Sequence, residues 1–174
     1  MCPYCSYFSR ALADHWEEFK TDYIEGKDIL FEVKVTDYFY ETMGNQYSRD
    51  SAEALYCSRN EDKFWDYYHN ALHHLWNDYQ SKGYGASKTS PQISNLPEDY
   101  WLNIGHEVGL GESFDNCIKN HDTVEEIKKN TAQAAQAIDG LPYFRFNKFT
   151  TGGFSDTWGW DYAKKYLDAG LSEK

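Results

Sequence analysis

Residues 62–79 have the sequence DKFWDYYHNALHHLWNDY and carry the clearest structural pattern in the chain. Apolar side chains recur there at intervals of three or four residues: Phe64, Tyr68, Leu72, Leu75 and Tyr79. This spacing places them on one face of a helix. An apolar face must be buried against other elements, so the stretch predicts a long helix inside a helical block.

The helical pattern extends on both sides of that stretch, from about residue 51 to residue 120. Leu96-Pro97 precedes a helix predicted through Trp101, and residues 113–118 predict a shorter one. Thr123 and Glu126 have the spacing of a capping box at the start of a further helix. The predicted apolar face of that helix consists of Val124, Ile127, Thr131, Ala134 and Ile138.

Strands and terminal helices are predicted outside this block. Residues 29–35 are rich in β-branched and aromatic side chains, with Phe31, Val33 and Val35 alternating against Glu32 and Lys34, and this pattern predicts a strand. Residues 143–147 follow Pro142 and predict another strand. A turn is predicted at 151–153. Helices are predicted at 3–20 and 158–169, the second closed by Gly170. The order of elements favours an α/β fold with a helical insertion.

Composition bounds the class of protein. The 174 residues carry a net charge of −11, which argues against nucleic acid or an anionic membrane surface as the main partner. Hydrophobic residues make up 41% of the chain, enough for a packed core. No apolar run approaches 18 residues, and no signal-peptide pattern is present. We therefore expect one acidic globular domain covering 1–174, with 48–122 as the helical insertion.

The sequence Cys2-Pro3-Tyr4-Cys5 places two thiols three residues apart where a helix is predicted to begin. Pro3 suits the first helical position because its missing N–H costs nothing there. The positive end of the helix dipole favours a thiolate, so we expect the pKa of Cys2 to lie below the usual value of about 8.5. Cys5, one turn along, is close enough to attack a mixed disulfide at Cys2. This pattern indicates redox chemistry without a metal or an organic cofactor.

Two other interpretations of the CxxC pair stay open at this point. Cys2 and Cys5 with His69 and His73, which are four residues apart, formally allow a Cys2His2 zinc site. Alternatively, the cysteines form an inert structural disulfide.

Several motifs together resemble the thioredoxin superfamily. CPYC opens a long helix, Gly140-Leu141-Pro142-Tyr143-Phe144 precedes a strand, and a helix ends the chain. The helical block between them resembles the DsbA-type branch of disulfide oxidoreductases, with finer similarity to its Gram-positive-like members. That similarity rests on 52–57 (AEALYC), on Lys63-Phe64-Trp65 with the following helix, and on 114–117 (FDNC).

The resemblance implies a thioredoxin-like fold and assigns roles to individual residues. Cys2 would be the attacking thiol and Cys5 the resolving one. Pro142 would be a cis-proline facing them, and Leu141, with Pro3 and Tyr4, would contact substrate. The resemblance also implies a disulfide between Cys57 and Cys117, the other interpretation being two buried thiols.

The implied activity is disulfide formation in exported proteins. Its partners would be thiol-containing polypeptides and a redox protein that reoxidises the enzyme. The resemblance and the four cysteines also imply an extracytoplasmic location.

The chain departs from the family pattern in two places. The family has a strand directly before CxxC, whereas this chain has only Met1, so we expect Met1 to be internal to a longer product that supplies the strand and any membrane anchor. Pro-Tyr between the cysteines, with 152–156 (GGFSD), also resembles glutaredoxins, which makes glutathione-linked disulfide reduction or isomerisation the alternative activity. The alternative without enzyme activity is a truncated interaction module.

Overall fold

The structure is a computed structural model that describes residues 3–27, 29–85, 89–93, 96–97, 99–137, 141, 143–146, 149–152 and 159–172. The chain divides into two compact units. The first, called here the helical unit, is Lys34–Ala137 and contains the predicted insertion, 48–122. The second, called the terminal unit, combines Cys2–Val33 with Ile138–Lys174.

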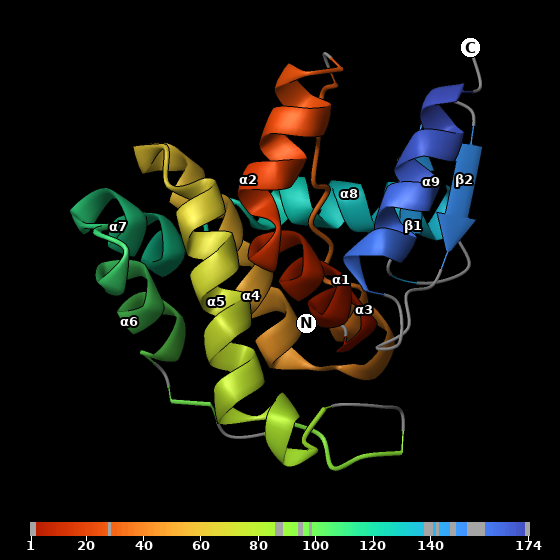
Figure 1. Cartoon of the computed structure of the whole chain (residues 1–174). Helices are drawn as coiled ribbons and strands as arrows, with labels where there is room; N and C mark the ends of the chain where they lie inside the picture. Colours follow the sequence, from red (N-terminus) through yellow and green to blue (C-terminus); the bar gives the residue numbers. More distant parts are fainter. Residues whose placement is uncertain are drawn as a thin grey trace. The chain divides into compact units, whose positions relative to one another are not determined.

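The fold is nearly all-helical, so the prediction of an α/β thioredoxin-like fold is wrong. Within the described ranges, the strands are β1 (Tyr143–Phe146) and β2 (Phe149–Gly152), which pair only with each other, antiparallel (Figure 1). Residues 29–35 belong to no strand. A strand needs a hydrogen-bonded neighbour, and alternation of side chains specifies extended backbone without supplying that neighbour.

Residues 29–35 do keep the burial pattern of a strand. Ile29, Phe31, Val33 and Val35 are half-buried, and the residues between them are exposed. The alternation therefore predicted correctly which side chains face inward, although it did not predict the hydrogen bonding.

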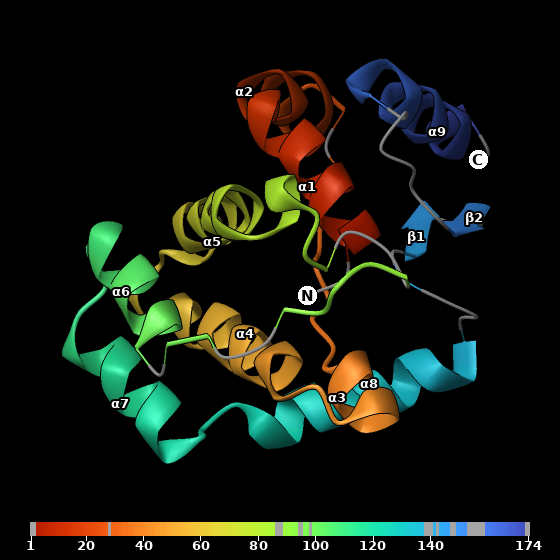
Figure 2. The same cartoon turned by 90° about the horizontal axis from the view of Figure 1, so that it is seen from below.

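The helical unit is built from short and medium helices. They are α3 (Tyr38–Met43), α4 (Gln46–Cys57), η2 (Ser58–Glu61), α5 (Phe64–Asp78), η3 (Gln80–Lys82), α6 (Tyr100–Glu107), α7 (Glu112–Asn120) and α8 (Val124–Ala137). Helix α4 contacts α5, α6, α7 and α8, and Figure 2 shows it among them. The core includes Tyr67, Leu75, Ile104 and Phe114, each exposed by 2% or less. The predicted helix at 62–79 is thus confirmed as α5.

Close approach between α6 and α7 depends on Gly105. A Cβ atom there would overlap the ring of Phe114, which is fully buried. Helix α7 begins at a side-chain cap, because the Glu61 carboxylate accepts hydrogen bonds from the Gly111 and Phe114 amides. These amides belong to the first turn of a helix, where no carbonyl of the helix itself is available.

The predicted capping box of α8 does not form. Thr123 Oγ1 is buried without a hydrogen-bond partner among the described residues, and the Glu126 carboxylate pairs with Arg59 at 2.6 and 3.1 Å. That pairing lowers the pKa of Glu126. A cation 67 positions away in sequence therefore replaces the local contact that the motif predicts. The predicted apolar face is present nonetheless, since Ile127 and Thr131 are buried.

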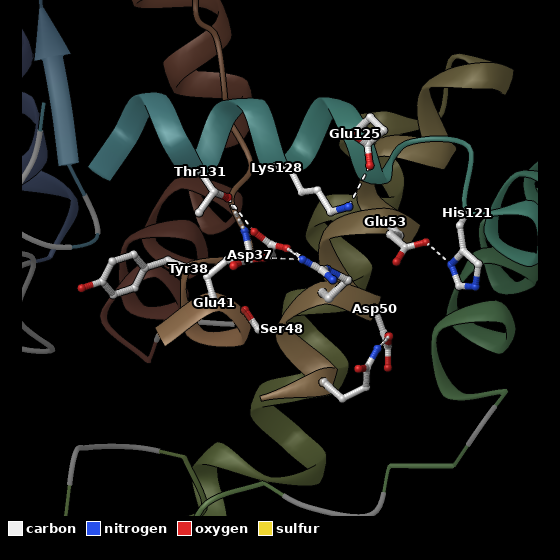
Figure 3. A network of polar contacts seen from close by, with 12 residues as sticks. Asp37, Tyr38, Glu41, Ser48, Asp50, Glu53, His121, Glu125, Lys128 and Thr131 are labelled. Atoms are coloured by element: carbon white, nitrogen blue, oxygen red, sulfur yellow. Dashed lines mark hydrogen bonds and ion pairs between the residues drawn. The ribbon is translucent and has the colours of Figure 1, made fainter. Parts of the chain in front are cut away.

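A buried ionic network attaches the segment before α3 to α4 and α8 (Figure 3). Asp37 is fully buried, and its Oδ2 accepts hydrogen bonds from Arg49 Nε and Nη2 at 2.8 and 2.6 Å. Its Oδ1 accepts one from Thr131 Oγ1, which in turn accepts one from the Asp37 amide. The carboxylate is therefore satisfied on both oxygens, as a buried charge requires.

The terminal unit contains α1 (Pro3–Asp14), α2 (Trp16–Phe19), the π-helical segment η1 (Lys20–Glu25), the β1–β2 hairpin and α9 (Trp160–Ser172). Its core is aromatic: Trp160 packs edge-on against Phe19 and Tyr23, with ring centroids 6.0 and 6.4 Å apart. Leu12 from α1 and Ala163 and Leu167 from α9 complete the buried set. The helix predicted at 3–20 breaks at His15, where φ is −121°.

Two boundaries near the C-terminus differ from prediction. Thr151 and Gly152 lie in β2 instead of a turn, with Phe146 opposite Phe149 in the hairpin register. Gly170, the predicted end of the last helix, is buried inside α9, which continues through Ser172. A glycine ends a helix only where the backbone turns left-handed, and burial here favours a residue without a side chain.

Candidate functional site

The CxxC motif lies where α1 begins. Helix α1 starts at Pro3, the residue after Cys2, and Cys5 lies in its first turn with a half-buried side chain. Tyr4 also belongs to this first turn. The amides of that turn have no carbonyl partner within the helix, so this end of α1 favours negative charge. Cys2 lies outside the described residues.

A ring contact joins the CxxC helix to the strand that follows Leu141-Pro142. Phe8, one turn beyond Cys5 on α1, packs against Phe144 of β1 with ring centroids 4.3 Å apart. Leu141, two residues before β1, is half-buried. The helix that carries Cys5 and the strand that follows Leu141-Pro142 are therefore in contact within the terminal unit. Pro142 lies outside the described residues, and its cis-peptide remains a prediction.

Phe8 and Phe144 were not among the predicted site residues, although both had a sequence signal. Phe8 is part of the apolar stripe of the first helix, and Phe144 belongs to the predicted strand. Each pattern marks a residue that packs, but neither pattern names its partner 136 positions away in the chain.

The structure contains a disulfide between Cys57 and Cys117, the pair implied by the family resemblance. Cys57 is the last residue of α4, and Cys117 lies in α7, with Cα atoms 5.7 Å apart. The two residues are 0% and 1% exposed, so a substrate thiolate has no direct access to their sulfur atoms. This bridge is suited to holding α4 against α7.

A second contact ties the same two helices one turn away. His121 follows α7, four residues beyond Cys117, and its Nδ1 lies 2.7 Å from Glu53 Oε2. Glu53 precedes Cys57 by four residues on α4, and its side chain is only 3% exposed. Because the numbering rises along one helix while it falls along the other, α4 and α7 cross antiparallel at these contacts.

The histidines of the zinc interpretation both lie on α5. His69 is half-buried, and burial lowers its pKa, with the nearby Asp66 opposing the shift. Exposed His73 contacts Asn77 at 2.8 Å through Nε2. Across the described ranges, no group of three or more His, Cys, Asp or Glu side chains is arranged to hold a metal ion. Cys2, one of the four ligands in that interpretation, lies outside those ranges.

Of the residues behind the glutaredoxin resemblance, Pro3 and Tyr4 lie in the first turn of α1. Gly152 ends β2, and 153–156 lie beyond it in the part of the chain that is not described. Among the described residues, no helix has the length and apolar character needed to span a bilayer.

Comparisons with models of protein families, with curated proteins and with solved structures find no match to this chain.

Proposed function

We propose that this protein is a thiol–disulfide oxidoreductase whose redox-active pair is Cys2 and Cys5. The observation that carries the proposal is the position of CPYC at the start of α1, together with the Phe8–Phe144 contact that brings this helix to the strand after Leu141-Pro142. The proposal concerns the chemistry of the motif and does not depend on a thioredoxin fold.

The helix start supports a reactive thiolate. Unpaired amides of the first turn and the positive end of the α1 dipole stabilise negative charge near the CxxC pair. A stabilised thiolate makes the reduced form of such a pair more favourable, and a protein with a stable reduced form oxidises its substrates. The direction of electron flow that we propose is therefore from substrate thiols to the Cys2–Cys5 disulfide.

The proposed cycle consists of two thiol–disulfide exchanges. A substrate thiolate attacks Cys2 of the Cys2–Cys5 disulfide, a mixed disulfide forms, and Cys5 leaves as a thiolate. A second substrate thiolate then attacks the substrate sulfur of the mixed disulfide, which forms the substrate disulfide and releases Cys2 as a thiolate. The substrate has lost two electrons, the enzyme has gained them, and an oxidising redox partner returns the pair to the disulfide.

We also propose that the protein works in an extracytoplasmic compartment on thiol-containing polypeptides. The Cys57–Cys117 bridge supports this location, because structural disulfides persist mainly where the surroundings are oxidising. Leu141 and Pro142, with Pro3 and Tyr4, are the proposed contacts for the substrate chain.

The reduction potential of the Cys2–Cys5 pair is the first test. The protein is equilibrated with glutathione buffers, alkylated and analysed by mass spectrometry. A potential near −120 mV is expected for an oxidase, whereas one near −270 mV would reverse the proposed direction to reduction. The buried Cys57–Cys117 pair is expected to stay oxidised in these buffers and serves as an internal reference.

Single-cysteine variants test the assignment of roles. Each variant is incubated with a peptide whose cysteine is joined by a disulfide bond to a good leaving group. The Cys5→Ser variant is expected to accumulate an adduct in which the peptide is bound to Cys2. The Cys2→Ser variant is expected to accumulate far less and to lose turnover. Equal turnover by Cys2→Ser and the unaltered protein would remove Cys2 as the attacking thiol. Preferential reaction of the adduct with glutathione over peptide thiols would favour the glutathione-linked activity instead.

A further inference from the structure

We draw no further inference here: the strongest candidate, the extended segment 29–35 between η1 and α3, which exposes 89% of Leu30 and joins no strand within the described ranges, carries nothing because nothing in the structure shows what would cover it.

Discussion

The helical unit and the terminal unit are each stabilised internally by a different kind of interaction. In the helical unit, one covalent link and one ion pair lie in the interior: the Cys57–Cys117 bridge is almost inaccessible, and Asp37 is fully buried with Arg49 as its counterion. In the terminal unit, the described ionic contacts lie at the surface, as with Lys27 and Asp168, whose side chains are 44% and 58% exposed. Its interior is formed instead by stacked and edge-on aromatic rings.

The residues with the largest expected effect on stability and the proposed reactive pair therefore belong to different units. Removing one partner of a buried ion pair lowers the free energy of unfolding by about 3–5 kcal/mol, because the other charge is left buried and unpaired. An exposed ion pair contributes only about 0–1 kcal/mol to that free energy. The proposed reactive pair belongs to the terminal unit, and the Cys57–Cys117 bridge belongs to the helical unit. We therefore expect large losses of stability when a buried link of the helical unit is removed and small losses when an exposed pair is removed.

The largest expected effect comes from replacing Cys57 and Cys117 together by alanine. The bridge spans 60 residues, and the chain-entropy model gives a loss of about 4 kcal/mol in the free energy of unfolding. Urea unfolding measures the loss, and hydrogen exchange followed by peptide mass spectrometry locates it. Exchange protection should fall most in α4 and α7. An equal fall in α9 would contradict the assignment of the bridge to one unit.

The next effect is expected for Arg49→Ala. The substitution leaves the buried Asp37 carboxylate without its cation, which costs about 3 kcal/mol. Arg59→Ala is the matched control, because Arg59 pairs with Glu126 at the same distance, 2.6 Å, but with side chains 41% and 48% exposed. Its expected cost is about 0–1 kcal/mol. Equal losses for both variants in urea unfolding would show that burial of Asp37 does not decide the energy.

A smaller effect is expected where a methyl group is added to a packed helix contact. In Gly105→Ala, overlap with the buried Phe114 ring outweighs the helix-propensity gain of about 1 kcal/mol, for a net loss of about 1–2 kcal/mol. Gly159→Ala, in the terminal unit, is the control, since no heavy atom lies within 4 Å of its added Cβ. Thermal unfolding compares the two. A stabilised Gly105→Ala would mean that Phe114 can move aside.

The smallest predicted effect depends on pH. Burial lowers the pKa of His69 below its ordinary value of 6.5, so the unfolded chain takes up this proton more readily than the folded one. The free energy of unfolding therefore falls as the pH drops below about 6.5, and His69→Asn should remove that part of the decline. His73→Asn, at an exposed position on the same helix, serves as the control. Urea midpoints between pH 5 and 8 measure the slope, and an unchanged slope in His69→Asn would assign the decline to other groups.

The amphipathic helices could be predicted from the sequence because their signal is local. The stripe from Phe64 to Tyr79 predicted α5, and the apolar spacing after Thr123 predicted α8. Both patterns repeat within a few residues, so one stretch of chain is enough to recognise them. The failure of the capping box shows the limit, because Glu126 binds a cation from a distant segment in place of the local contact.

The sheet and the polar network could not be predicted, since both depend on partners far away in sequence. Residues 29–35 have the alternation of a strand, but no pattern says whether another strand lies alongside. Asp37 and Thr131 are 94 positions apart, and neither stands in a motif that names the other. For the candidate site, the sequence located the CxxC motif and Leu141, while the Phe8–Phe144 packing that brings their elements together required the structure.

The two ties between α4 and α7 have a mechanical consequence. With the disulfide alone, α4 and α7 could rotate relative to each other about that bond. The Glu53–His121 contact lies one helical turn away from the disulfide, so the two contacts together resist this rotation. The disulfide and the Glu53–His121 contact together fix the angle at which α4 and α7 cross. This angle should therefore persist when other contacts around the two helices are broken.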